Sequence, residues 1–395
     1  MSIPRTSPYD GPALLSYGFR PFFLFGALYA GLSILFWLPL FEGRLEIWSA
    51  FHPVDWHVHE MLFGFLAAVI TGFLLTAVPN WTGSLPVQGT PLLVLFVIWL
   101  AGRIAITLSA VIGPLPAALV DCAFLAAVVL IAGREITAGR NWRNIKVLLP
   151  VAVLLAANIF FHWEAWSEGS SDVSRRLGMS AAIVLIMLIG GRVIPSFTRN
   201  WLVRENPGRL PTPFDRFDIV VIAVSTAALA AWTGAPDWGG TGIALGAAGV
   251  LNIFRLLRWA GDRTLKDPLV LILHLAYAFV PAGFVLSGLA VLAPEWVTSA
   301  AGIHSFGTGA VGAMTLSVMV RATLGHTGRV LHAGRAACFV FAAIVLAALI
   351  RILASFELFP DAHLVHLAGL AWAAAFLGFA LAYARALLTA SSPKS

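Results

Sequence analysis

Long apolar stretches recur along the whole chain, and short segments rich in Pro and Gly separate them. A helix that crosses a bilayer needs about 20 predominantly apolar residues. The pattern therefore predicts an all-α polytopic membrane protein with about twelve spanning helices. The expected spans are Phe19–Pro39, Trp56–Val78, Leu92–Ile112, Leu115–Ala132, Val147–His162, Leu177–Pro195, Phe217–Thr233, Gly242–Leu257, Leu269–Leu292, Ser299–Val320, Ala336–Leu353 and Leu364–Leu388.

The composition agrees with this fold class and excludes some classes of function. The chain of 395 residues is 59% hydrophobic and 11% charged, whereas a soluble domain carries about 25% charged residues. A β-barrel would show short alternating strands instead of continuous apolar runs. No connecting segment is long enough for a soluble domain, so we expect residues 1–395 to form one integral membrane domain. Nucleic-acid binding is excluded, because it would need a basic domain exposed to water.

The distribution of basic residues predicts the orientation. If the N-terminus is cytoplasmic, most of the 25 Lys and Arg residues fall on the cytoplasmic side, as the positive-inside rule requires. An even number of spans then places both termini in the cytoplasm. The two cysteines, Cys122 and Cys338, lie in apolar runs without a CxxC neighbour, so neither a disulfide nor a thiolate metal site is expected.

Arg103 is a charged residue inside a predicted span. It falls within the third span, and Asp121 falls within the fourth. An ionised side chain at this depth is costly and needs a partner. One interpretation is a structural Arg103–Asp121 pair. The other is that Arg103 faces a buried anion such as a haem propionate.

The stretch WHVHE at the start of the second span places His57, His59 and Glu60 at the membrane boundary. On a regular helix His57 and His59 point about 200° apart, since each residue turns by about 100°. They cannot bind the same metal from such a helix, whereas His57 and Glu60 share a face. One imidazole is therefore a candidate metal ligand. Simple anchoring at the interface is the alternative.

His304 begins the tenth span, on the same predicted side of the membrane as His57 and His59. Two axial histidines on facing helices can hold haem iron, so His304 pairs with His57 or His59 as a candidate haem ligand. Small residues on this helix would let a flat macrocycle approach the backbone, and close helix packing is the alternative. These residues are Gly302, Gly307, Gly309 and Gly312.

Four further histidines are candidate metal-binding or catalytic residues. His363 and His366 are three residues apart and share a helix face, and imidazole suits copper. His162 ends the fifth span and is a candidate ligand or supporting hydrogen-bond donor. His274 is deeper, in the ninth span, and with Glu60 it is a candidate catalytic residue. A surface or core role is the alternative for each histidine.

Several blocks in order resemble the NnrS family, membrane proteins associated with bacterial responses to nitric oxide. The blocks are GFRPFFLFGALYA, WHVHEMLFGF, TAVPNWTG, WLAGR, GGRVIPSFTRN, the Leu-His pair of the ninth span and GAMTLSVMVRATLGHTGR. The resemblance implies haem, expected to be of the b type, and copper. It also implies a bacterial inner-membrane location and protection against nitrosative stress. The polar residues that it marks are His57, His59, Glu60, Arg103, Arg192, His274, Arg321, His326 and Arg329.

A weaker, architectural likeness is to subunit I of the haem–copper oxidases. These also have twelve helices with both ends inside, and histidines on the second and tenth helices hold a low-spin haem. This chain departs from that pattern because its sixth and seventh spans contain no histidine. A copper centre with three histidines is therefore not expected at the usual place.

The sequence predicts a haem-containing membrane protein that binds nitric oxide or another diatomic gas. The protein could capture the gas alone, or it could reduce the gas in a reductase-like reaction with electrons from a donor. The sequence is compatible with both. The alternative is a membrane transporter or sensor without redox chemistry. The segment between Pro79 and Pro91 carries no charge, which argues against a major-facilitator transporter.

Overall fold

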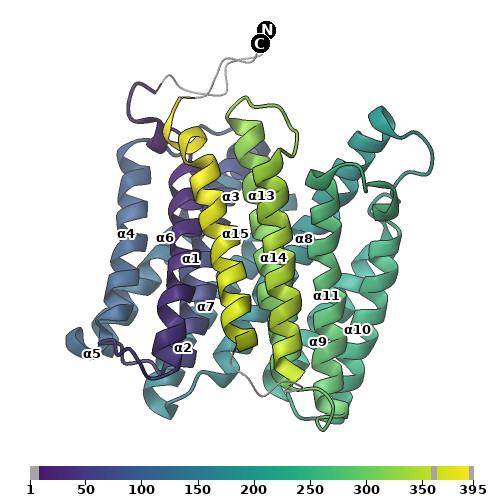
Figure 1. The fold of residues 1–395 in the computed structure, drawn as a ribbon. Coiled ribbons are helices and arrows are strands. Elements are labelled where there is room, and N and C mark those ends of the chain that lie inside the picture. Colours follow the sequence, from purple (N-terminus) through teal and green to yellow (C-terminus); the bar gives the residue numbers. More distant parts are fainter. Residues whose placement is uncertain (1–8, 357–362, 391–395) are drawn as a thin grey trace. The chain divides into compact units, whose positions relative to one another are not determined.

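The described part of the computed structural model, residues 9–356 and 363–390, contains helices and no strand (Figure 1). The elements in chain order are η1 (Ala13–Leu15), α1 (Phe19–Phe41), α2 (Pro53–His59), η2 (Glu60–Leu66), α3 (Ala67–Thr82), α4 (Thr90–Thr107), α5 (Ser109–Ile112), α6 (Pro114–Ala138), η3 (Trp142–Asn144), α7 (Ile145–Glu168), α8 (Asp172–Glu205), α9 (Arg216–Gly234), α10 (Gly239–Leu257), η4 (Gly261–Arg263), α11 (Pro268–Leu292), α12 (Ser299–His304), η5 (Ser305–Gly312), α13 (Ala313–His326), α14 (Arg335–Leu353), η6 (Ala354–Phe356) and α15 (His363–Leu388).

Twelve helical stretches in the described residues are long and apolar enough to cross a membrane. The predicted fold class and the predicted number of spans are thereby confirmed. Several helices extend beyond the predicted ends, and the sixth runs over Asp172–Glu205 where Leu177–Pro195 was expected. The apolar run marks only the part of a helix in hydrocarbon, while the helix itself continues into the polar boundary. The predicted cytoplasmic position of both termini stays a prediction.

Two spans contain a π-helical segment. The second span, Pro53–Thr82, consists of α2, η2 and α3, and the tenth, Ser299–His326, consists of α12, η5 and α13. In both, the wider turn begins directly after a histidine, His59 or His304. Single π turns inside α-helices occur frequently at functional sites.

The chain divides into two compact units. Unit 1 holds the described residues within Met1–Gly178, Ala322–Val330 and Phe379–Ser395, and unit 2 holds those within Met179–Arg321 and Leu331–Gly378. The expectation of one membrane domain over residues 1–395 remains a prediction.

In unit 1, α1 packs on α3, and α6 packs on both α4 and α7. The α1 side chains Phe23, Ala27 and Ala30 are buried. Gly72 of α3 admits the Phe23 ring, because a Cβ at Gly72 would lie 2.8 Å from that ring. The outer face of α4 exposes a stripe at helical spacing, Leu93, Val97, Leu100 and Ile104, as expected for a surface that contacts lipid.

In unit 2, α10 and α11 run side by side (Figure 1). Their backbones approach closely because both helices carry glycine at the contact. A Cβ at Gly288 of α11 would lie 2.8 Å from the carbonyl oxygen of Gly242. This is the small-residue packing by which helices associate in membranes.

The buried side chain of Arg20 joins the beginning of α1 to the end of α15 within unit 1. Its guanidinium donates to the carbonyl oxygens of Ala386 at 3.3 Å, Leu387 at 2.9 Å and Thr389 at 2.7 Å. Carbonyls at the end of a helix have no partner within the helix, so a cation there satisfies them and complements the helix dipole.

We expect Arg20→Met to lower the free energy of unfolding by about 1.5–3 kcal/mol, the range for a hydrogen bond to a charged group. Unfolding of the purified protein in detergent micelles, followed by tryptophan fluorescence, measures the change. Arg44→Met is the control, because the Arg44 side chain is 76% exposed and its ion pair with Glu42 lies at the surface. Equal losses in the two variants would contradict the assignment.

Candidate functional site

Four helices of unit 1 bring polar side chains together at one end of the unit. His59 and Glu60 lie at the junction of α2 and η2, Arg103 near the end of α4, Asp121 near the start of α6 and His162 in the last turns of α7. All five are buried, with side-chain exposures of 8% or less. Consecutive spans run in opposite directions, so the start of one span meets the end of the next. This group of five residues is called the polar cluster.

Arg103 connects the two carboxylates of the polar cluster. One terminal nitrogen lies 2.6 Å from Oε1 of Glu60, and the other contacts Oδ1 of Asp121. The Tyr29 hydroxyl donates to Oε2 of Glu60. The predicted Arg103–Asp121 pair is present, and Glu60 is its second anionic partner. Removing one member of such a buried pair typically costs about 3–5 kcal/mol.

Three atoms of the polar cluster have the chemistry of a metal site. Nε2 of His59 lies 3.2 Å from Oδ2 of Asp121, and Nε2 of His162 lies 3.1 Å from the same oxygen. One ligand atom from each residue lies within 4.8 Å of the other two. Two imidazoles and one carboxylate are a ligand set used for iron and other first-row transition ions.

The hydrogen bonds around His59 fix which nitrogen carries a proton. Nδ1 of His59 lies 2.8 Å from Oε1 of Glu60, and a carboxylate can only accept, so Nδ1 donates. Nε2 of His59 faces Oδ1 of Asn158 at 3.1 Å as well as Asp121. The Asn158 amide nitrogen donates to Oδ2 of Asp121 at 2.8 Å, which leaves its oxygen toward His59. Nε2 of His59 therefore faces two acceptors and requires a cation or a proton.

The π turn and one glycine make this arrangement possible. Side chains at adjacent positions of a regular helix do not face each other, yet those of His59 and Glu60 are hydrogen-bonded where η2 begins. Gly64, inside η2, leaves room for Arg103, since a Cβ there would lie 2.6 Å from a guanidinium nitrogen. The Gly64 carbonyl accepts a hydrogen bond from the indole of Trp99 at 3.0 Å.

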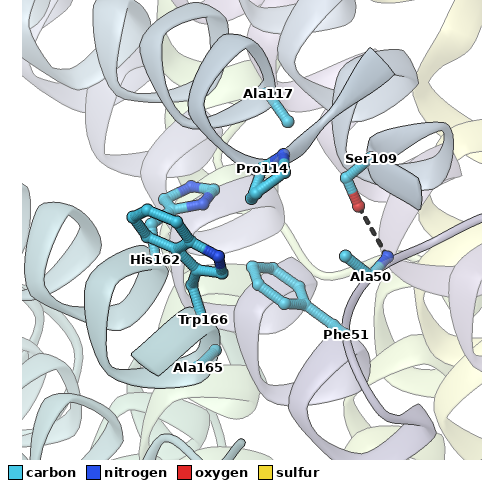
Figure 2. A pocket seen from close by; sticks show the side chains of 8 residues that line it. All are labelled: Ala50, Phe51, Ser109, Pro114, Ala117, His162, Ala165 and Trp166. Atoms are coloured by element: carbon cyan, nitrogen blue, oxygen red, sulfur yellow. Dashed lines mark hydrogen bonds between the residues drawn. The ribbon is translucent and has the colours of Figure 1, made fainter. Parts of the chain in front are cut away.

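A cavity of about 160 Å³ lies beside the polar cluster, within unit 1. Figure 2 shows the rings of Phe51, His162 and Trp166 around it. The remaining lining residues are Ala50, Ser109, Pro114, Ala117 and Ala165. His162 thus belongs both to the wall of the cavity and to the candidate metal site.

The other histidines of the predicted site lie apart from the polar cluster or in unit 2. His57 is half-buried and stacks on Trp37, with ring centroids 4.4 Å apart. In unit 2, Nδ1 of His304 lies 2.8 Å from the carbonyl oxygen of Ala300 in the preceding turn. Haem ligation by His304 together with His57 or His59 stays a prediction.

Protein side chains fill the flank of small residues on the tenth span. A Cβ at Gly309 would meet the ring of Phe279 on α11, and one at Gly312 would meet Trp372 on α15. A Cβ at Gly307 would lie 3.3 Å from the methyl group of Met179. In unit 2 these glycines therefore allow close packing of side chains, as one of the two interpretations proposed.

His363 and His366 occupy the first turn of α15, His363 exposed and His366 half-buried. His274 is buried, and its Nε2 lies 2.8 Å from the hydroxyl of Thr198. No described contact joins these three histidines to one another.

The four remaining polar residues of the family blocks do not join the polar cluster. Arg192 and Arg329 are exposed. The Arg321 guanidinium lies 3.8 Å from the ring centroid of Phe197 in unit 2. His326 is exposed and stacks against Tyr17 in unit 1.

A second buried polar network, in unit 2, was missed by the sequence analysis. Arg255 is fully buried, with Nε 2.8 Å from Oδ1 of Asp218 and one terminal nitrogen 2.8 Å from the hydroxyl of Tyr277. That hydroxyl donates to Asn252. Arg255 lies inside the predicted span Gly242–Leu257, so the argument that singled out Arg103 would also have found it.

We expect Gly64→Ala to disrupt the polar cluster, because the added methyl group displaces the Arg103 guanidinium. Overpacking of this kind costs about 1–3 kcal/mol, to be measured as loss of stability in detergent. Gly26→Ala is the matched control on α1, since its Cβ would make only ordinary contact, 3.5 Å from Ala68. Equal stability of Gly64→Ala and the parent protein would show that the guanidinium does not occupy this position.

The comparison with known proteins adds a family to this geometry. No curated protein sequence and no solved structure matches the chain. A family model described as NnrS protein matches residues 13–391, nearly the whole chain and the full extent of the polar cluster. The chain belongs to the NnrS family.

Proposed function

We propose that this membrane protein protects bacteria against nitric oxide by binding the gas at a metal ion held in the polar cluster. Family membership supports a role in the nitric oxide response. The geometry supports a metal ion at His59, Asp121 and His162. On the predicted orientation, this site lies toward the periplasmic side of the bacterial inner membrane.

One observation carries the proposal: both ring nitrogens of His59 face acceptors, so Nε2 requires a positively charged partner where the ligand atoms converge. Two carboxylates, Glu60 and Asp121, face the single guanidinium of Arg103. With neutral imidazoles, the cluster has an excess of one negative charge in a buried environment, which is strongly unfavourable. A bound cation removes the excess and gives Nε2 of His59 the partner that its two acceptor neighbours cannot provide.

A single ion suits the surroundings of His59 better than a porphyrin does. The rings of Phe51, Phe63, Phe161 and His162 all lie with centroids 5.2 Å from that of His59. They occupy the space that a macrocycle bound to His59 would need. The adjoining cavity of about 160 Å³ is smaller than the roughly 300–1,000 Å³ that encloses drug-sized ligands. His57 and His304 stay the candidate haem ligands.

Within the polar cluster, some residues would bind the ion and others would orient those ligands. Arg103 binds Oδ1 of Asp121, which leaves Oδ2 directed toward His59 and His162. Glu60 accepts the proton of Nδ1, which holds the His59 ring with Nε2 toward Asp121. Such supporting hydrogen bonds orient metal-binding histidines and raise their basicity. An iron or copper ion in this set would offer nitric oxide an open coordination position.

The test is the metal content of purified protein, measured by mass spectrometry after extraction in mild detergent. We expect close to one iron or copper ion per chain. His162→Ala should lower metal affinity by more than the roughly 10–100-fold typical of changing a supporting residue. His366→Ala should keep the metal, because His366 belongs to unit 2 and is not one of the ligand residues in unit 1.

Two further measurements separate the possible outcomes. The electron paramagnetic resonance signal of the nitric oxide complex should disappear in His162→Ala, along with protection of cells against a nitric oxide donor. Absence of metal from the parent protein would mean that a proton balances the charge of the cluster, and the proposal would fail. A haem spectrum that is lost in His304→Ala, with the ion at the polar cluster retained, would place haem at a separate site.

A further inference from the structure

We propose that the cavity beside His162 is the entry pocket through which a small uncharged ligand reaches the polar cluster, with Phe51 as the gate between the cavity and His59. The inference deepens the proposed function and rests on it for the identity of the ligand. Its independent support is the placement of the cavity, the chemistry of its lining and the position of Phe51 on a non-helical segment in its wall.

The cavity leads from the protein surface to a buried histidine. Trp166, at its outer side, is 69% exposed, whereas His162 is 8% and Ala117 is 1% exposed. Nε2 of His162 lies 3.1 Å from Asp121, so the same ring borders the cavity and the candidate metal site. A ligand in the cavity would therefore be one side chain away from the ion.

The lining of the cavity selects for uncharged ligands. No lining residue is acidic or basic apart from His162. The Ser109 hydroxyl donates to the carbonyl oxygen of Ile106 at 2.8 Å and accepts from the Ala50 amide at 2.8 Å, so its hydrogen bonds are already made. An ion entering this space would lose its hydration without gaining partners. An apolar diatomic gas loses little on entry, and a cavity near 150 Å³ is large enough even for xenon or benzene.

Phe51 lies in the wall of the cavity and next to the imidazole of His59, which does not line the cavity. Its ring lines the cavity and lies with its centroid 5.2 Å from that of His59 and 5.5 Å from that of His162. Figure 2 shows this ring directed into the pocket. Phe51 belongs to the non-helical segment between α1 and α2, whereas His59 and His162 lie on helices. Rotation of one ring on a loop therefore opens the path without moving a helix.

The first experiment tests the cavity independently of any metal. Crystals of the parent protein under xenon pressure should show xenon beside His162. Ala117→Leu should remove this xenon, because Ala117 lies at the buried end of the cavity. Ala165→Leu, at the half-exposed side, provides a second filling variant in case Ala117→Leu folds poorly. The matched control is Ala123→Leu on the exposed face of the same helix, α6, which should retain the xenon.

The second experiment measures the rate at which nitric oxide binds to the metal-loaded protein, by stopped-flow spectroscopy. We expect association at least about tenfold slower in Ala117→Leu or Ala165→Leu, with the metal content and the final spectrum unchanged. Phe51→Ala should bind faster, and Phe160→Ala, whose ring stacks on Trp163 outside the cavity, should behave like the parent.

The outcomes distinguish the two proposals. Absence of xenon from the cavity, or unchanged association rates in both filling variants, would overturn the entry pocket while leaving the metal site intact. A rate in Phe51→Ala equal to that of the parent would overturn the gate. Absence of metal from the parent protein would overturn the proposed function, and xenon would still report whether the cavity accepts a small apolar ligand.

Discussion

The arrangement of unit 1 depends on one buried guanidinium. Arg103 lies inside a membrane-spanning helix and is 4% exposed, where an unpaired charge would be costly. The two anions that compensate it, Glu60 and Asp121, come from different spans. The requirement to pair Arg103 therefore ties α4 to both the second and the fourth span. It also fixes Asp121 with Oδ2 toward His59 and His162, while Oε1 of Glu60 contacts both Arg103 and Nδ1 of His59.

This pairing demands local departures from regular structure. The second span widens into a π turn at Glu60, which lets His59 and Glu60 interact although they are neighbours in sequence. Gly64 then provides the space that the guanidinium occupies. The irregular turn lies where the polar side chains converge, as is common for π turns at functional sites. A metal ion at His59, Asp121 and His162 would complete the charge balance, and the cavity beside His162 would give a small gas access to it.

Much of the site was predicted from the sequence, but its internal pairing was not. A pair of Arg103 with Asp121 was one of the two interpretations offered, because each is an ionised residue in an apolar run. The helical wheel placed His57 beside Glu60, whereas in the structure Glu60 contacts His59 and His57 stacks on Trp37. The helical wheel assumes a regular helix, and no pattern in the sequence predicted the π turn. Asn158 and Tyr29 were not singled out, because one polar residue in a span gives no indication of what it faces.

The sequence by itself determined the all-α class, the twelve spans and the family, since these follow from apolar periodicity and from blocks of residues in order. The tertiary structure alone decided that five residues from four helices share one buried cluster, and that His162 borders a cavity as well as a carboxylate. The physical reason is distance along the chain. Apolar length is a local property that each segment carries with it, whereas the partner of a buried charge depends on which helices pack together and on how each is rotated.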